Sequence, residues 1–390
     1  MTGVQTCALP ILAVALNQLG AHVDEIETDH GIDWQVTPRT LAGPTTIDCG
    51  LAGTVMRFLP PVAALATGLI RFDGDPRARV RPMKAIIDSL RQLGVEVEDD
   101  NRGMLPFTLT GVGHVTGGEV IVDASASSQF VSALLLAGAR YDDGIVVRHR
   151  GDALPSVPHI DMSVAMLRER GVRVDVDITS EQEATWTVYP GPIAALDTVV
   201  EPDLSNAAPF LAAAMVTRGS VTIPDWPTQT TQPGAQLPAL LESMGGSTHM
   251  NADGLTVRGP ETLRGLTANL KEVGELTPVL AAICALASTE SHLSGIAHLR
   301  GHETDRLTAL ATEINRAGGN ASETEDGIVI RPSHLHAADC ETYDDHRMAT
   351  AAAVIGLAID GVRVRDIGTT SKTLPNFEHM WSDMLTQDLA

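Results

Sequence analysis

Acidic and basic side chains stand next to one another in two short stretches of the second half of the chain. In GHETDR, Glu303 precedes Arg306, and in DDHRM, His346 precedes Arg347. Such stretches suit proton transfer if the pKa of His346 lies near its ordinary switching range. The alternative is plain ion pairing between neighbours. The same two interpretations apply to three further acidic residues: Glu275, Asp305 and Asp345.

A second group of polar residues, Ser127, Ser128 and Gln129, stands directly before the apolar run FVSALLLAG. One interpretation is helix capping, because Ser is a favoured N-cap residue. The other is anion binding, because the free N–H groups and the dipole of a helix start favour a phosphate. Gly53 in LAGT is likewise either a turn residue or a point where a Cβ atom would clash with a ligand.

Cations recur beside the starts of several expected helices: Arg57, Arg77, Arg79, Arg81, Arg306, Arg347 and Lys372. A single arginine of this kind is usually a surface or ion-pair residue. Several of them at equivalent points of different segments predict a polyanionic ligand. His302 in the same region is either part of this site or a solvated loop residue.

The elements that must position these residues form a repeat. Helical segments end in glycine at intervals of 73 to 77 residues: Gly20, Gly94, Gly171, Gly245 and Gly318. Gly is the expected residue just after a helix. Each of these glycines is followed by a strand, a turn and a strand. Between the hairpins lies a second, nearly all-apolar helix, which must be buried. A repeat architecture follows, with apolar helices at the centre and glycine-terminated helices at the periphery.

The count of segments is uneven: there are six peripheral helices, counting LPNFEHMWSDML at the end of the chain, but five apolar ones. Residues 1–10 do not resemble the front half of a repeat, and we expect them to be a non-native or artificial start. The remaining chain is expected to form two domains, 11–196 and 197–390, of which the first lacks its beginning.

The charge and the cysteine content of the chain argue against several classes of partner and site. The formal charge is −22 and the pI about 4.8, which argue against nucleic acid or an anionic membrane as the main partner. Four scattered cysteines favour neither a disulfide framework nor a zinc site, and fit a reducing cytoplasm. No apolar run reaches the roughly 18 residues of a membrane span.

Seven motifs in consistent order now resemble a known family: GLAGTVMR, DPRARVRP, SSQFVSALLLAG, PSVPHIDM, HETDRLTA, DDHRMA and SKTLPNFE. Together they are similar to the EPSP synthases (3-phosphoshikimate 1-carboxyvinyltransferases), in a form close to that of high-GC actinobacteria. The resemblance covers roughly residues 11–385. It implies an inside-out α/β fold of repeated βαβαββ units in two similar domains, which agrees with the repeat.

The resemblance also implies an activity. The family transfers the enolpyruvyl group of phosphoenolpyruvate to the 5-hydroxyl of shikimate 3-phosphate and releases phosphate, in the shikimate pathway of aromatic amino-acid biosynthesis. It uses no metal or organic cofactor, and we expect a monomer that binds only these small molecules. Glyphosate competes with phosphoenolpyruvate in this family, and Gly53 implies sensitivity to it.

Roles follow by matching the family's motifs to this sequence. Shikimate 3-phosphate would be bound by Ser127, Ser128, Gln129, Ser156, Glu275 and His302. Phosphoenolpyruvate would be bound by Gly53, Arg81, Gln129, Arg306, Arg347 and Lys372. Catalysis would fall to Glu275, which takes the proton of the 5-hydroxyl, and to Glu303 and His346, the candidates for a proton shuttle at the methylene carbon. Lys372 would also be catalytic.

Three departures from the family pattern bear on function. The N-terminal Lys-Ser…Arg motif is absent, His302 stands where many relatives have Lys, and Leu51 stands where Asn is common. One alternative is therefore a truncated, non-catalytic ligand-binding remnant. Another is UDP-N-acetylglucosamine enolpyruvyltransferase, but that family's reactive Cys would fall near residues 71–82, where this sequence has none.

Overall fold

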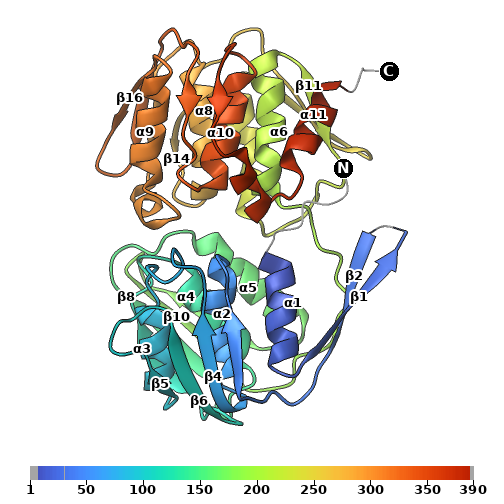
Figure 1. The fold of residues 1–390 in the computed structure, drawn as a ribbon, viewed down its shortest axis with the longest axis vertical. Coiled ribbons are helices and arrows are strands. Elements are labelled where there is room, and N and C mark those ends of the chain that lie inside the picture. The colour runs from blue at the N-terminus through green and yellow to red at the C-terminus, as the bar shows by residue number, and fades with distance from the viewer. Residues whose placement is uncertain (1–7, 30, 387–390) are drawn as a thin grey trace. The chain divides into compact units, whose positions relative to one another are not determined.

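A computed structural model of the protein describes residues 8–29 and 31–386. The chain divides into two compact units, one ending at Thr198 and the other beginning at Val199 (Figure 1). Each unit has its own cluster of buried apolar residues. Of the expected non-native start, residues 1–7 lie outside the described residues.

The unit that ends at Thr198 contains the order β-α-β-α-β-β twice. The first copy consists of β3 (Thr45–Asp48), α2 (Gly53–Ala63), β4 (Thr67–Asp73), α3 (Lys84–Gln92), β5 (Glu96–Glu98) and β6 (Phe107–Val112). The second consists of β7 (Gly118–Val122), α4 (Gln129–Gly138), β8 (Ile145–Arg150), α5 (Val157–Glu169), β9 (Val174–Ile178) and β10 (Glu183–Val188). They are preceded by α1 (Ala8–Gln18) and the hairpin of β1 (His22–Thr28) and β2 (Gly31–Thr37).

The unit that begins at Val199 repeats this order once in full and twice in part among the described residues. Its first copy has α6 (Leu204–Thr217), β11 (Ser220–Ile223), the 3-10 helix η1 (Pro233–Gln236), α7 (Leu237–Ser243), β12 (Ser247–Asn251) and β13 (Gly254–Arg258). The second has β14 (Thr267–Asn269), η2 (Gly274–Leu276), α8 (Thr277–Ala285), β15 (Ser291–Ser294), η3 (Ala297–Gly301), α9 (Arg306–Arg316), β16 (Asn320–Glu323) and β17 (Ile328–Arg331). The last has β18 (Asp339–Cys340), α10 (His346–Gly356), β19 (Arg363–Val364), η4 (Ile367–Lys372) and α11 (Phe377–Thr386).

Sheet topology is the same in each complete copy. The four-stranded sheets have the orders β3-β4-β6-β5, β7-β8-β10-β9 and β14-β15-β17-β16. The first pair of each sheet is parallel and the other pairs are antiparallel. The prediction of an α/β fold built from repeated βαβαββ units is confirmed.

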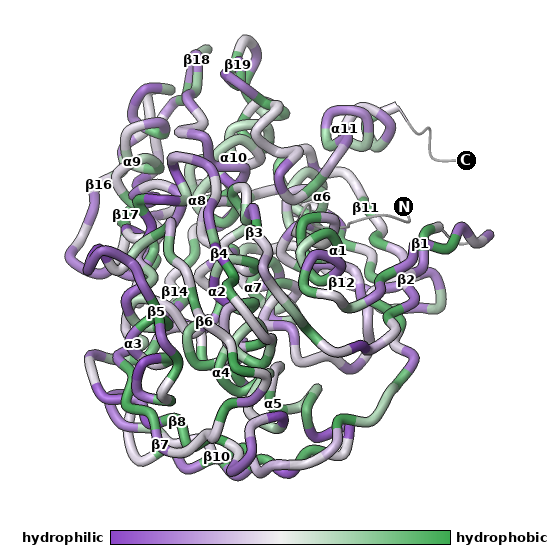
Figure 2. The backbone as a smooth tube through the Cα atoms, turned by 60° about the horizontal axis from the view of Figure 1, so that its bottom comes forward, coloured by the Kyte–Doolittle hydropathy of each residue, from purple (hydrophilic) through white to green (hydrophobic). Residues whose placement is uncertain are grey.

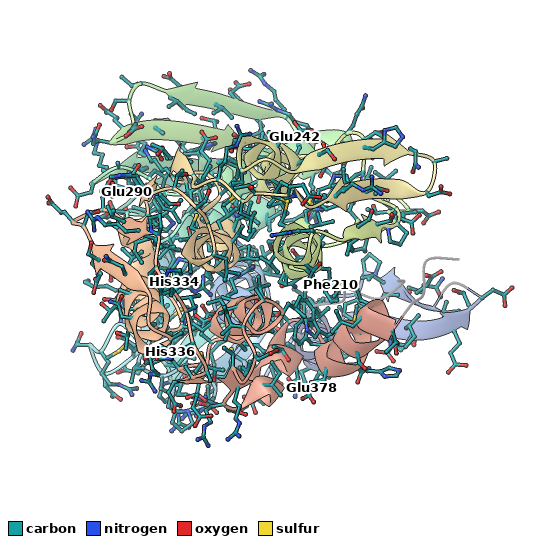
Figure 3. The ribbon with its side chains drawn as sticks, turned by 90° about the horizontal axis from the view of Figure 1, so that it is seen from above. Phe210, Glu242, Glu290, His334, His336 and Glu378 are labelled. Carbon is teal, nitrogen blue, oxygen red and sulfur yellow. The ribbon has the colours of Figure 1, made fainter. Side chains whose placement is uncertain are left out.

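Burial separates the two kinds of helix as predicted. All nine residues of α8 are buried, whereas α11 at the periphery buries only Phe377 among its described residues. The apolar helices α6, α8 and α10 pack against one another in one unit, and α2 packs against α4 in the other (Figure 1). Figure 2 shows how hydrophobic residues dominate α4. Phe210, labelled in Figure 3, lies on α6. Its ring contacts the rings of Phe377 and Trp381 on α11.

The predicted helix ends are also confirmed. All five glycines after the peripheral helices have positive φ: Gly20, Gly94, Gly171, Gly245 and Gly318. A side chain in this region of φ would be strained, so glycine terminates each helix at low cost.

Within the described residues, no helix has both the length and the apolar character that crossing a membrane requires.

Candidate active site

Arg306, the first residue of α9, lies at the centre of a group of charged side chains. Its side chain is only 1% exposed, and it contacts three carboxylates. Nε donates to Asp345 Oδ2 at 2.7 Å, one Nη to Glu275 Oε2 at 3.0 Å, and the other to Glu303 Oε2 at 2.9 Å. Nη1 also lies 3.2 Å from His302 Nδ1. The planar guanidinium fork presents five N–H donors in a fixed geometry, which suits it to several carboxylates at once.

The start of α10 joins the same group. Asp345 is the N-cap residue and accepts from the backbone N–H of Arg347 at 2.9 Å. The Arg347 side chain then reaches Glu275, with Nε 2.6 Å from Oε2, and donates to Ser205 Oγ at 3.0 Å. Because Ser205 lies in the first turn of α6 and Glu275 directly before α8, the starts of three buried helices meet around Arg347.

Lys372 completes the group, since its Nζ donates to Glu303 Oε1 at 2.7 Å. We call these residues the Arg306 cluster: Glu275, His302, Glu303, Arg306, Asp345, His346, Arg347 and Lys372. Every residue of this unit that the sequence predicted for the site therefore lies in one place. The sequence named Asp345 as an acidic candidate but gave it no role in the site, and it did not single out Ser205, for which the DLSN pattern, with Asp just before a helix, was the available signal.

Electrostatics keep the carboxylates ionised. Burial raises the pKa of Glu275, but the charges of Arg347 and Arg306 outweigh it and hold that pKa well below its usual value. Burial likewise raises the pKa of Glu303, and Arg306 and Lys372 bring it well below the usual range. Asp345 shows the same balance, with a lowered pKa. Arg306 itself stays protonated, because its three carboxylates overcome the effect of burial.

The expectation that the pKa of His346 lies near neutrality is wrong. Burial, together with the charge of Arg347, lowers its pKa to about 3, far from the expected switching range near neutrality. Its side chain is 7% exposed, and neither ring nitrogen hydrogen-bonds to another described residue. His346 is therefore neutral at physiological pH and is no store of a transferable proton. Asp305, by contrast, has the simpler role, since it caps α9 at Thr308 and pairs with Arg300 at 3.2 Å.

In the other unit, Arg57 links the starts of two buried helices. It lies on α2, is 6% exposed, and donates to Gln129 Oε1 at 2.8 Å at the start of α4. Its Nη1 lies 3.4 Å from Ser127 Oγ, and its guanidinium carbon lies 5.1 Å from the ring centre of Phe130. We call Arg57, Ser127, Gln129 and Phe130 the Arg57 cluster. The sequence singled out Arg57 as a cation near a helix start but gave it no role in the site.

The serines differ in how they meet the helix starts. Ser128 is the N-cap residue of α4, yet its side chain caps no backbone N–H of the described residues, so the capping interpretation is wrong for it. Ser127 Oγ accepts from the backbone N–H of Gln129 at 3.3 Å. Ser156 precedes α5 with φ of 52°, a left-handed conformation that is costly for a residue other than Gly, and it too provides no side-chain cap. Two serine hydroxyls at helix starts are thus not committed to capping.

Gly53 begins α2 beside Arg81. A Cβ atom on Gly53 would lie 2.7 Å from Nη1 of Arg81, so glycine is what lets this guanidinium approach the helix start. The neighbouring cations behave differently. Arg77 pairs with Asp75 at 3.2 Å and Arg79 with Asp73 at 2.8 Å, so for these two the ion-pair interpretation is confirmed.

The chain is similar to known proteins over nearly its whole length. The family model of EPSP synthase (3-phosphoshikimate 1-carboxyvinyltransferase) matches residues 10–381. The chain is 52% identical over 382 residues to the 3-phosphoshikimate 1-carboxyvinyltransferase of Kocuria rhizophila, a match that covers 96% of this chain and 85% of that protein.

Solved structures agree in fold. EPSP synthase from Acinetobacter baumannii matches with a TM-score of 0.75 and 22% identity, over 96% of this chain and 87% of that one. The enolpyruvyl transferase NikO from Streptomyces tendae matches with a TM-score of 0.69 and 17% identity, over 97% of this chain and 87% of that one. The match to the family model and the identity to the Kocuria protein confirm the resemblance seen in the motifs: the chain belongs to the EPSP synthase (3-phosphoshikimate 1-carboxyvinyltransferase) family.

Proposed function

We propose that the protein transfers the enolpyruvyl group of phosphoenolpyruvate to the 5-hydroxyl of shikimate 3-phosphate and releases inorganic phosphate. The observation that carries the proposal is the Arg306 cluster, in which three helix starts and three cations meet in a member of this family. Helix starts and guanidinium groups both favour phosphate and carboxylate groups.

Shikimate 3-phosphate would place its phosphate at the start of α4. Ser127 and Ser128 stand there with hydroxyls and with the first N–H groups of the helix, and Ser156 stands at the start of α5. Gln129 would contact both substrates. Arg57 donates to its amide oxygen at 2.8 Å and so fixes the orientation of the amide. His302 and Glu275 would bind the hydroxyl groups of the ring.

Phosphoenolpyruvate would bind to Arg306, Arg347 and Lys372, and the family's pattern also assigns Gly53 and Arg81 to it. In the Arg306 cluster, three described cations are balanced by the carboxylates of Glu275, Glu303 and Asp345. Arg306 is fully buried, but Arg347 and Lys372 are 13% and 23% exposed. These two can therefore turn to an incoming anion, and each then releases a carboxylate that it had paired with.

The carboxylates that Arg347 and Lys372 release can then take part in proton transfer. When Arg347 binds the substrate, Glu275 loses a counter-charge and becomes a stronger base, ready to take the proton of the 5-hydroxyl as its oxygen attacks C2 of phosphoenolpyruvate. The methylene carbon gains a proton in the same step. Lys372 donates that proton. In the second step Glu303 accepts a proton from the methyl group and returns it to Lys372, 2.7 Å away, while the leaving phosphate takes up the proton held by Glu275. His346, neutral and buried, would pack beside the reacting carbon rather than supply the proton.

The reaction is tested by ³¹P NMR on the full chain with both substrates. The expected result is the appearance of inorganic phosphate and of a new phosphate monoester in equal amounts, only when both substrates are present. Binding of shikimate 3-phosphate without any turnover would instead identify a ligand-binding protein. Turnover of UDP-N-acetylglucosamine in place of shikimate 3-phosphate would contradict the proposed acceptor.

Replacing Ser128 with alanine separates ligand binding from capping. Because the hydroxyl caps no helix in the described structure, we expect the free energy of unfolding to change by less than about 0.5 kcal/mol. The Kd for shikimate 3-phosphate, measured by calorimetry, should rise by about tenfold with the loss of a hydrogen bond to a charged phosphate. The matched control is Ser163→Ala, which removes a buried hydroxyl 3.2 Å from His159 O on α5. Equal Kd values in Ser128→Ala and the wild type would contradict the proposed role.

Replacing Gly53 with alanine should displace Arg81. The new Cβ would overlap the guanidinium, which must move because it is the mobile end of its side chain. We expect the KM for phosphoenolpyruvate and the inhibition constant of glyphosate both to rise, by about tenfold, with folding nearly unchanged. Gly191→Ala is the control, since nothing lies within 4 Å of its added Cβ. Unchanged inhibition in Gly53→Ala would refute the assignment of Gly53 and Arg81 to this site.

We further propose that the protein works in the cytoplasm as a monomer. The described cysteines, Cys49, Cys284 and Cys340, are free and buried, which supports a reducing compartment. Size-exclusion chromatography with light scattering tests the oligomeric state.

A further inference from the structure

His149 lies beneath both loops that carry the serines proposed to bind phosphate. It is a residue of β8 with no exposed surface. The loop after the neighbouring strand β7, residues 123–128, leads to Ser127 and Ser128. The loop after β8 itself, residues 151–156, leads to Ser156. The imidazole hydrogen-bonds to the backbone of both loops.

The hydrogen bonds of His149 are specific. The backbone N–H of Ala124 donates to Nδ1 at 3.2 Å, and Nε2 lies 3.0 Å from the carbonyl oxygen of Asp152. A backbone N–H can only donate and a carbonyl oxygen can only accept, so Nδ1 is the acceptor and Nε2 carries the proton. His149 is therefore a neutral bridge of fixed tautomer between the two loops.

The bridged loops are tied to each other and to the serines. Ala124, which donates to His149, also accepts from the backbone N–H of Ser127 at 3.0 Å through its carbonyl oxygen. Ser125 Oγ lies 3.1 Å from the same Asp152 carbonyl oxygen that His149 contacts. The loops pack so closely that a Cβ on Gly151 would lie 2.3 Å from Asp123 Oδ1. A change at His149 is therefore transmitted to both sides of the phosphate site.

We propose that His149 is a positioning residue that holds the two serine loops in the arrangement that recognises the phosphate of shikimate 3-phosphate. It touches no substrate. It fixes the distance between the start of α4, with Ser127 and Ser128, and the start of α5, with Ser156. The proposal rests on the proposed function, and it concerns how the site distinguishes a phosphorylated acceptor from its unphosphorylated form.

The test compares the affinities for shikimate 3-phosphate and for shikimate, which lacks the phosphate. The measured quantity is the ratio of the two Kd values, obtained by calorimetry on the full chain. His149→Leu removes both hydrogen bonds at similar volume, and His149→Asn keeps an acceptor for Ala124. Val147→Ala, also on β8 and fully buried, is the control for a general loss of packing.

We expect His149→Leu to reduce the preference for the phosphorylated ligand by about tenfold, with His149→Asn in between and Val147→Ala within about twofold of the wild type. A purely structural role would lower both affinities together and leave the ratio unchanged. If His149→Leu does not fold, His149→Asn decides the question, and an unchanged ratio in that variant overturns the proposal. A wild-type protein that binds both ligands equally would overturn this inference and the proposed function together. A wild type that prefers the phosphate, with His149 variants that keep the preference, would overturn the inference alone.

Discussion

Replacing Arg306 with methionine is expected to destabilise the protein by about 3–5 kcal/mol near neutral pH, because it leaves the buried carboxylate of Asp345 without its cation and takes one of two cations from both Glu275 and Glu303. Arg306 is 1% exposed and contacts Glu275, Glu303 and Asp345. Methionine retains most of the volume of the arginine side chain, so the loss of stability reports the lost charge rather than lost packing. Chemical denaturation of both proteins gives the difference in the free energy of unfolding. Arg331→Met, an exposed arginine paired with Glu290, is the control and should change the stability by less than about 1 kcal/mol.

The destabilisation should depend on pH in a defined direction. In the wild type, the pKa values of Glu275 and Glu303 are well below their usual values, so they contribute stability above about pH 4.5 that is lost as the pH falls through the folded pKa values. In Arg306→Met, Glu275 keeps Arg347 and Glu303 keeps Lys372, but the buried Asp345 loses the cation that outweighs its burial, so the pKa of Asp345 rises. The variant should therefore recover part of its deficit as the pH falls from about 7 towards about 5. A deficit that is constant over this range would show that the ion pairs are not its cause.

Replacing Arg347 with alanine should remove activity while the fold remains. The side chain is 13% exposed and Glu275 keeps Arg306 as a partner, so we expect a loss of stability of only about 1 kcal/mol. The value of kcat/KM for phosphate release should fall by about 100- to 1,000-fold, since a cation that stabilises the developing charge is lost. Calorimetry with phosphoenolpyruvate in the presence of shikimate 3-phosphate provides a readout that does not need turnover.

Two variants make the Arg347 result specific. Arg347→Lys keeps the charge but not the planar fork, and it should recover only part of the activity. Arg170→Ala removes an arginine of similar exposure, 19%, that lies outside the Arg306 cluster and should keep full activity. Near-normal kcat/KM in Arg347→Ala would count against the whole assignment of phosphoenolpyruvate to this cluster.

The sequence predicted the fold well because its signals are local and repeated. The five glycines at helix ends and the apolar central helices recur with one period, and the structure has the same helices in the same order. The position of Arg306 and Arg347 beside helix starts was likewise visible, since Asp305 and Asp345 immediately precede those helices as N-cap residues.

What the sequence could not predict depends on contacts between distant segments. Arg57 was one of several cations near helix starts, and its contact with Gln129 at 2.8 Å depends on how α2 and α4 pack. The pKa of His346 follows from burial and from the charge of Arg347, neither of which the residue type reveals. The role of His149 was not visible in the sequence, because its two hydrogen-bond partners lie in separate loops. Such roles arise only when the helix starts and loops are brought together.

The central claim is that serines at the starts of α4 and α5 bind one phosphorylated substrate, while the cations of the Arg306 cluster bind the other. Calorimetric titration of shikimate 3-phosphate alone into the wild type, Ser128→Ala and Arg347→Ala tests it most directly. The account predicts a Kd about tenfold higher in Ser128→Ala and a change of less than about threefold in Arg347→Ala. Loss of shikimate 3-phosphate binding in Arg347→Ala, with wild-type affinity in Ser128→Ala, would contradict it.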